Sequence, residues 1–115
     1  MDNWAICLDI NIPFLFQQII QCKIISYDTV EIIHEDNIYK TSIENIRIIS
    51  PLKFLIGDQV SPKNHPELIG IIWNTIYHFG KNEPTYYIKI NGKKKSKRYF
   101  ENDLICRNQL KGLMV

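Results

Sequence analysis

The clearest alternation of apolar and polar positions lies in the second half of the chain. In the segment TYYIKI (85–90), Tyr86, Ile88 and Ile90 occupy every second position. Successive side chains of a strand point to opposite faces, so this period of two predicts a β-strand with these three residues on one face and the intervening residues on the other. Asn91-Gly92 follows directly, and this dipeptide is the strongest short signal for a two-residue hairpin turn.

Turn signals divide the rest of this half into further short strands. Gly57-Asp58 forms a bend, Pro62 and Pro66 interrupt a loop, and GKNEP (80–84) forms a turn, because glycine and proline are the strongest local breakers of regular structure. The segments between them are rich in β-branched and aromatic residues, which suit a pleated surface. The predicted strands are 54–60, 68–77, 85–90, 97–100 and 105–107.

The first half repeats this order of elements in a weaker form. Four pairs of segments correspond: 9–13 with 58–62, 19–27 with 68–77, 29–33 with 85–90, and 38–46 with 96–104. The second copy has the longer loops, which is where a duplicated β unit is expected to accept insertions. The pattern predicts two β units, 1–50 and 51–115, which can form one compact domain; a chance match is the alternative. One helical turn is predicted at 14–20.

A set of short motifs connects the chain to a known class of small barrels. The motifs are Gly57-Asp58-x-Val60, Gly70-Ile71-Ile72, Tyr87-x-Lys89-x-Asn91-Gly92, Tyr99 and Asp103-Leu104. In this order they resemble the Tudor, KOW and Src-homology-3 class, and the likeness covers the second half better than the first. The resemblance implies an all-β fold of two tandem small Src-homology-3-like barrels packed together. Closing five strands into a barrel leaves few free strand edges.

Composition places the chain among ordinary globular proteins. Its 115 residues are 45% hydrophobic and 23% charged, and no apolar run approaches the length of about 20 residues that spans a bilayer. The stretch MDNWAICLDI lacks the basic residues that begin a secretory signal, so we expect a cytoplasmic protein with no membrane partner. Cys7, Cys22 and Cys106 form no C-x-x-C pair, which favours reduced, buried thiols.

The histidines do not form a pattern of catalytic or metal-binding residues. His34, His65 and His78 lie in or beside predicted turns and have no helical pair spacing, whereas a metal site needs three or four converging ligands. His78 could form an acid–base pair with Glu83 or Glu101 only if folding brings them together. Glycine-rich phosphate loops and nucleophile motifs are also missing from the sequence. We therefore expect no enzymatic activity, no cofactor, no metal and no small-molecule substrate.

The densest positive charge follows the Asn-Gly turn directly. Its residues are Lys93, Lys94, Lys95, Lys97 and Arg98. Such a cluster attracts polyanions, and neighbouring aromatic rings suit the stacking of single-stranded RNA or DNA. Two alternatives stay open at this point: a solvated hairpin tip whose lysines protect a strand edge from pairing, and a contact for an acidic protein surface.

Charge is divided unevenly between the two halves. Residues 1–50 hold three basic and seven acidic residues, a net charge of −4, whereas residues 51–115 hold eleven basic and five acidic residues, a net charge of +6. The candidate acidic contact residues are Asp28, Glu31, Glu35, Asp36 and Glu44. A basic partner would be attracted to them at long range, which speeds encounter and sets specificity. A solvated acidic face is the alternative.

Aromatic residues supply candidate anchors for a partner: Trp73, Tyr77, Tyr87 and Tyr99. Tyrosine and tryptophan are typical anchors at protein interfaces. The resemblance to Tudor barrels adds the possibility of an aromatic cage around a methylated cation. A small barrel also needs large side chains inside, so packing in the core is the alternative for each of them.

These features together predict a non-enzymatic binding module. Its size and composition are similar to those of small bacterial immunity proteins, which bind a toxin domain, often a nuclease with a basic cleft, and block its active site. That resemblance implies protein–protein recognition of a toxin domain through the acidic residues and the aromatic anchors. The alternative is a Tudor- or KOW-like module that binds RNA or DNA through the basic hairpin.

Overall fold

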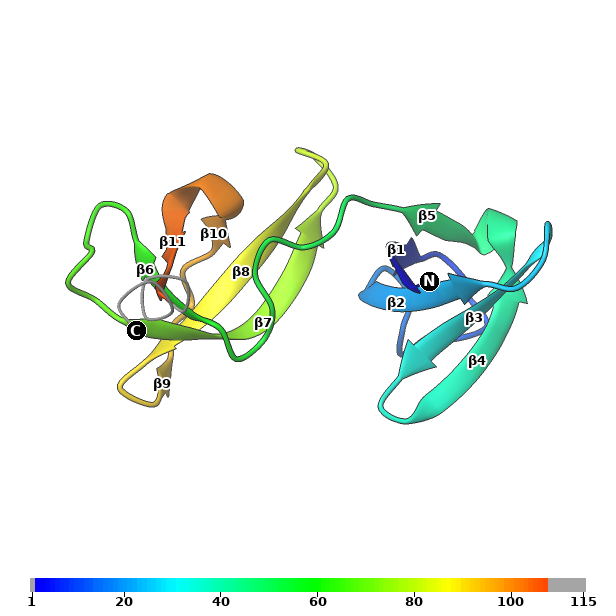
Figure 1. The fold of residues 1–115 in the computed structure, drawn as a ribbon, viewed down its shortest axis with the longest axis horizontal. Coiled ribbons are helices and arrows are strands. Elements are labelled where there is room, and N and C mark those ends of the chain that lie inside the picture. Colours follow the sequence, from blue (N-terminus) through cyan, green and yellow to red (C-terminus); the bar gives the residue numbers. More distant parts are fainter. Residues whose placement is uncertain (1, 108–115) are drawn as a thin grey trace, which may run out of the picture. The chain divides into compact units, whose positions relative to one another are not determined.

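The computed structural model describes residues 2–107 and divides the chain into two compact units, Met1–Leu52 (unit 1) and Lys53–Val115 (unit 2). Each unit contains one antiparallel sheet and one short 3-10 turn (Figure 1). The predicted all-β class is therefore confirmed. No helix in residues 2–107 is both long enough and apolar enough to cross a membrane.

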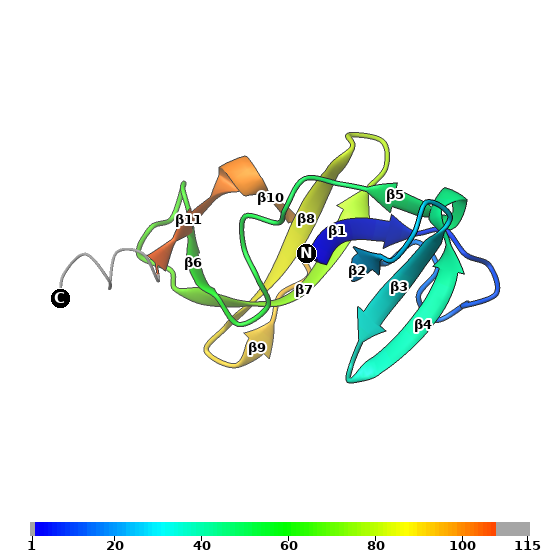
Figure 2. The same ribbon diagram turned by 45° about the vertical axis from the view of Figure 1, so that its right-hand side comes forward.

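Unit 1 is a five-stranded sheet in the order β4-β3-β2-β1-β5. Its strands are β1 (Asp2–Cys7), β2 (Ile19–Ile24), β3 (Thr29–His34), β4 (Asn37–Ser42) and β5 (Ile46–Ile48), and the 3-10 helix η1 (Ile43–Asn45) precedes β5. Glu35 and Asp36 form the β3–β4 turn with φ of 46° and 65°. This two-residue turn makes β3 and β4 a hairpin (Figure 2).

The inner face of this sheet forms the core of unit 1. Alternate residues of β2 and β3 are buried there, including Cys22, Val30 and Ile32 at 0% exposure, as the period of two requires. Cys7 joins the same cluster. Burial raises the pKa of the Cys7 and Cys22 thiols, so these side chains act as small hydrophobes, as the sequence predicts.

The loop between β1 and β2 is fixed by a buried carboxylate. Asp9 accepts a hydrogen bond from the Thr41 hydroxyl at 2.6 Å and another from the Asn11 N–H at 2.8 Å. These two donors hold the pKa of the Asp9 carboxyl below its usual value, because both stabilise its charged form. The loop continues as a series of turns to residue 17, with Leu15 buried against the core.

Unit 2 has the same order of strands, with a longer central pair. Its strands are β6 (Gln59–Pro62), β7 (Gly70–His78), β8 (Glu83–Ile90), β9 (Lys93–Lys94), β10 (Tyr99–Phe100) and β11 (Leu104–Cys106), and the 3-10 helix η2 (Glu101–Asp103) precedes β11. The order is β10-β8-β7-β6-β11, with β9 also paired to β8. Among the described residues the edge strands of each sheet do not pair with one another, so the hydrogen bonding leaves both sheets open.

Tyr86 is the largest side chain at the centre of the unit 2 core. It is fully buried, its ring meets that of Phe54 edge-on at 5.4 Å, and its hydroxyl donates to Glu101 at 3.2 Å. Burial, followed by the Glu101 carboxylate, raises the pKa of Tyr86 above its ordinary value. Ile88 lies in the same cluster and Ile90 packs against it, so the predicted division of this strand into two faces is confirmed.

Position 70, at the start of β7, is a glycine because a larger residue would not fit there. A Cβ at this position would lie 3.0 Å from the Ile88 side chain and 3.3 Å from the Lys89 carbonyl oxygen, which is tighter than ordinary contact. The β8 strand therefore approaches the backbone closely at Gly70.

The sequence places three elements wrongly. The first strand of unit 1 is β1, ahead of the segment 9–13, which forms turns around Asp9 instead. The predicted helical turn at 14–20 is replaced by the end of that loop and the start of β2. In unit 2 the first strand begins only at Gln59, because Gly57 adopts a φ of 96° and turns the chain just before it.

Candidate ligand-binding surface of unit 2

The Asn-Gly turn places the first two lysines of the basic run on opposite faces of the sheet, with Lys93 opposite Ile90. Asn91 and Gly92 have φ of 52° and 77°, the pair of positive values that a type I′ hairpin turn requires. The turn sets Lys94 opposite Lys89 in the β8–β9 pairing. Directly opposed residues share a face, so Lys94 lies on the outer face of the sheet together with Tyr87.

A bulge in β7 brings a tryptophan to this outer face. The pairing of β7 with β8 shifts between Ile72 and Asn74, which leaves Trp73 as the extra residue. Its ring lies 5.9 Å from that of Tyr87, and the Lys94 Nζ lies 4.5 Å from the centre of the Trp73 ring. Bulges commonly re-aim a side chain next to a functional site.

These two rings and the lysine above them form what we call the aromatic patch: Trp73, Tyr87 and Lys94. Both rings are half-buried and Lys94 is exposed. The Trp73 Nε1 is buried and has no hydrogen-bond partner among the residues that the structure describes. A cation at this distance from an indole face is attracted to the ring electrons, so Lys94 is positioned by the ring while its charge stays at the surface.

The other basic residues lie in β9 and on the segment that leads to β10. Lys93, Lys95, Lys97 and Arg98 are all exposed. The Lys97 Nζ lies 5.1 Å from the centre of the Tyr99 ring, a second pairing of a lysine with an aromatic face. The basic segment, 93–98, is therefore a continuous exposed stretch in which Lys94 contacts the Trp73 ring and Lys97 contacts the Tyr99 ring.

The acidic residues of unit 1 do not gather in the same way. Glu31 lies on β3 with Lys23 opposite it on β2 and Lys40 opposite it on β4, so its charge is balanced by cross-strand neighbours. Asp28 precedes β3 and accepts hydrogen bonds from the hydroxyls of Ser26 and Thr29, which lower the pKa of its carboxyl.

The remaining acidic residues are divided between the two ends of β3. Glu35 and Asp36 form the turn after this strand. Glu44 lies in η1 near Asp28, whose carbonyl accepts the N–H of Ile43. The two ends of a six-residue strand are roughly 20 Å apart. The structure therefore does not bring the five carboxylates onto one continuous surface.

The aromatic anchors also separate into different environments. Tyr77 is buried, at 7% exposure, and its ring packs against Phe79 at 5.3 Å. Tyr99 is half-buried on β10 and packs against the unit 2 core. Trp73 and Tyr87 are the two anchors that the structure brings into contact.

Histidines and cysteines do not form a centre for chemistry in the described part of the chain. No group of three or more His, Cys, Asp and Glu side chains in residues 2–107 could hold a metal ion. The His78 ring packs against Phe100 at 5.6 Å. Its Nδ1 accepts a hydrogen bond from the Lys81 N–H at 3.1 Å.

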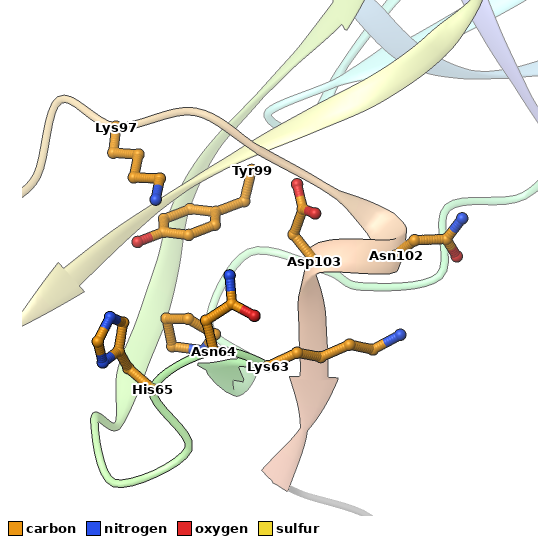
Figure 3. A pocket seen from close by; sticks show the side chains of 8 residues that line it. Lys63, Asn64, His65, Lys97, Tyr99, Asn102 and Asp103 are labelled. Carbon is orange, nitrogen blue, oxygen red and sulfur yellow. The ribbon is translucent and has the colours of Figure 1, made fainter.

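Sequence reasoning missed one feature, a pocket on unit 2. Its lining comes from the loop after β6 and from residues 97–103 (Figure 3). These segments are 30 residues or more apart in the sequence. The motif Pro62-Lys63-Asn64-His65 contained its polar groups, but nothing in the sequence indicated that they would face Lys97 and Tyr99.

Comparison with known proteins gives one family. Residues 13–105 match the family described as Family of unknown function (DUF6960). The chain belongs to this family. Neither the search of curated proteins nor the search of solved structures gives a match. The DUF6960 match extends from the loop after β1 to β11 and therefore spans most of both units.

Proposed function

We propose that this DUF6960 member is a non-enzymatic, cytoplasmic binding module whose unit 2 holds single-stranded nucleic acid. We also propose that each unit is a partly open barrel of the Src-homology-3-like class. The common order of strands, with a 3-10 turn before the last strand of each unit, supports this fold assignment. Small barrels of this kind bind ligands on one face of the sheet and on the loops beside it.

The observation that carries the functional proposal is the adjacency of the basic segment and the aromatic patch. Lysine is depleted in protein–protein interfaces, whereas a lysine-rich stretch is the usual contact for a phosphate backbone. Trp73 and Tyr87 lie in contact beside it, with Lys94 directly over the indole. Positive charge together with stacking surfaces is the combination that single-stranded nucleic acids require.

The two parts of this surface would act on different parts of the ligand. Exposed ammonium groups at 93–98 would neutralise phosphates and release condensed counterions. The rings of the aromatic patch would meet a base that is not paired in a duplex. Lys94 connects the two, because a base that stacks on the indole would displace its Nζ from the ring, and the ammonium group could then contact a phosphate.

Emission from Trp73 tests this proposal. The chain has two tryptophans, Trp4 and Trp73, so a Trp4→Phe variant reports from the patch alone. Titration with a single-stranded oligouridine should quench this emission to a plateau, because a base would approach the indole. No change in emission at saturating oligonucleotide would count against the patch as the binding site.

A second candidate function is protein recognition, as in an immunity protein, through the β3–β4 hairpin of unit 1. One observation favours it: the Phe14 side chain is 58% exposed and rests against His34 and Tyr39, with ring distances of 6.0 and 5.4 Å. Ile38, at 62% exposure, lies on the same hairpin. Exposed aromatic and aliphatic anchors next to an acidic turn fit a partner with a basic cleft.

Protection from a toxin tests this second candidate. We expect the chain to protect a bacterial host against a secreted toxin encoded in the neighbouring reading frame, and a Phe14→Ser variant to lose most of that protection. The fold should be retained, because Phe14 is largely exposed. Equal protection by the unchanged chain and the Phe14→Ser variant, or no protection by either, would exclude this hairpin as the toxin-binding surface.

A further inference from the structure

The pocket of unit 2 has a volume of about 200 Å³ and two walls. One wall is the loop after β6, with Lys63, Asn64 and His65, and the other is the chain from Lys97 through Tyr99 to η2. Figure 3 shows the Lys97 side chain directed toward the Tyr99 ring, with Asn64 and His65 on the facing wall. This volume is large enough for a small polar group and part of the molecule to which that group is attached.

The polar groups of this pocket are mainly hydrogen-bond donors. Lys97 directs its ammonium group and Asn64 its side-chain amide toward the space between the walls, whereas the Lys63 and Asn102 side chains run away from the Tyr99 ring (Figure 3). Asp103 also lines the pocket, but its Oδ2 accepts the N–H of Phe100 at 3.0 Å. Its carboxylate is therefore engaged in holding the 3-10 turn.

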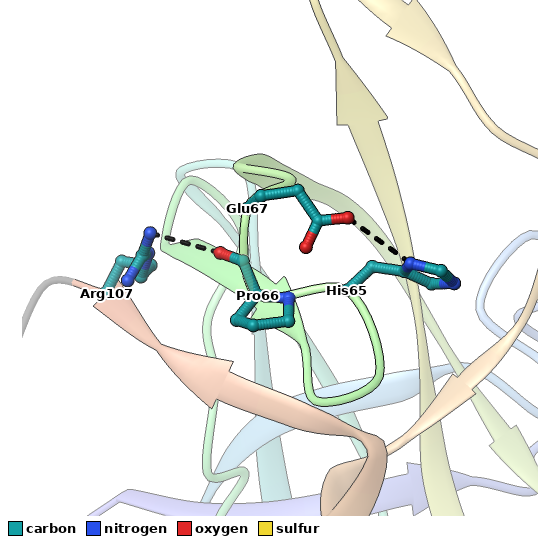
Figure 4. A network of polar contacts seen from close by, with 4 residues as sticks. All are labelled: His65, Pro66, Glu67 and Arg107. Carbon is teal, nitrogen blue, oxygen red and sulfur yellow. Dashed lines mark hydrogen bonds and ion pairs between the residues drawn. The ribbon is translucent and has the colours of Figure 1, made fainter.

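Backbone hydrogen bonds hold the first wall in place. The Lys63 N–H donates to the Asp103 carbonyl at 2.9 Å, and the His65 N–H donates to the Pro62 carbonyl at 3.1 Å. The Arg107 guanidinium donates to the Pro66 carbonyl at 3.2 Å (Figure 4). The loop is thus tied to η2 and to the residue that follows β11.

A carboxylate orients the histidine of this wall. The His65 Nδ1 lies 3.3 Å from a Glu67 carboxylate oxygen (Figure 4). With Nδ1–H donating to this carboxylate, Nε2 is an acceptor in the neutral ring and donates to a ligand only when the imidazole is protonated. His65 is exposed, so a ligand can reach it from solvent.

We propose that this pocket binds a phosphate monoester. Such a group carries a charge of about −1.5 to −2 at neutral pH and three strong acceptor oxygens, which match the Lys97 ammonium, the Asn64 amide and a protonated His65 imidazole. The Tyr99 ring offers an apolar wall for the group that bears the phosphate. The end of a nucleic-acid strand and a free nucleotide share this chemistry. The inference rests on the pocket itself and stands whether or not the aromatic patch binds a strand.

Titration of the full chain with adenosine monophosphate, followed by amide chemical shifts in NMR spectra, tests this inference. We expect saturable shifts at residues 63–67 and 99–103, and none with adenosine, which lacks the phosphate. A second titration compares 5′-phosphorylated and 5′-hydroxyl forms of one oligonucleotide. Tighter binding of the phosphorylated form would assign the site to strand ends, and equal binding would assign it to free nucleotides.

Two matched variants separate the pocket from the basic segment. Lys97→Met removes a charge that lines the pocket, whereas Lys95→Met removes an equivalent exposed charge that does not. We expect the first variant to weaken binding of the monophosphate by about tenfold, because a charge-assisted hydrogen bond is lost, and the second to change it by less than about twofold. Equal weakening by both variants, or equal binding of adenosine and its monophosphate, would overturn the proposal. Loss of oligonucleotide binding alone would not.

Discussion

Replacing Lys93 and Lys95 with alanine should lower the affinity of the chain for a single-stranded oligonucleotide by at least about tenfold at low salt. Both side chains are exposed on the basic segment, so their loss removes phosphate contacts without disturbing the core. The slope of log affinity against log salt should become shallower by about 1.4, since each lost contact on a single strand contributes roughly 0.7. Fluorescence anisotropy of a labelled strand at several salt concentrations measures both quantities.

A second pair of lysines provides the control for this variant. Lys23 and Lys40 are also exposed, but they lie on β2 and β4 of unit 1 beside Glu31. Their joint replacement by alanine removes the same charge and should leave the salt slope unchanged. If both pairs weaken binding equally, the attraction depends on net charge alone, and the basic segment is not a specific contact.

Replacing Tyr86 with alanine should lower the free energy of unfolding of unit 2 by about 3–5 kcal/mol. Tyr86 is fully buried against Phe54, and its hydroxyl donates to Glu101, so the variant leaves both a cavity and an unused acceptor. Loss of this much is comparable to the whole stability of a small unit. Urea denaturation followed by circular dichroism measures the change.

Its neighbour on the opposite face provides the comparison. Tyr87→Ala should lower the free energy of unfolding by no more than about 1 kcal/mol, because the side chain is half-exposed on the aromatic patch. The same variant should weaken binding of the oligonucleotide, since a stacked base is worth about 1–3 kcal/mol. A Tyr87→Ala variant that unfolds as easily as Tyr86→Ala would contradict the assignment of faces on β8.

Local patterns were enough to predict the centre of unit 2. The alternation at 85–90 and the Asn-Gly turn depend only on neighbouring residues, and both recur in the structure as β8 and a turn with two positive φ values. The prediction of an all-β chain rested on the same kind of signal. Register then follows, because a two-residue turn fixes which residues of β8 and β9 oppose one another.

The elements that the sequence placed wrongly have one feature in common. Their structure depends on contacts between residues that are distant in the sequence. Asp9 resembles the acidic start of a strand, but its carboxylate is used by Thr41, 32 residues away, to close a loop. The true first strand, β1, is buried by its pairing with β2 and β5. Its alternation is weak because Ala5, Ile6 and Cys7 are all fully buried.

The candidate site was predictable only in part for the same reason. The basic segment was evident from its composition, but the partner of Lys94 is set by the bulge that exposes Trp73, and no single-strand pattern signals a bulge. The acidic residues appeared as a set in the sequence. The pairing register places Glu31 between two lysines and sends the others to opposite ends of β3.

The most direct test of whether unit 2 binds single-stranded nucleic acid at the aromatic patch is a titration of the Trp4→Phe variant with a labelled single-stranded oligouridine. Trp73 emission reports contact with the patch, and anisotropy of the labelled strand reports total binding. We expect quenching and anisotropy to follow one saturable curve, and a duplex of the same length to quench less. A strand that binds without altering Trp73 emission, or that fails to bind at low salt, would contradict it.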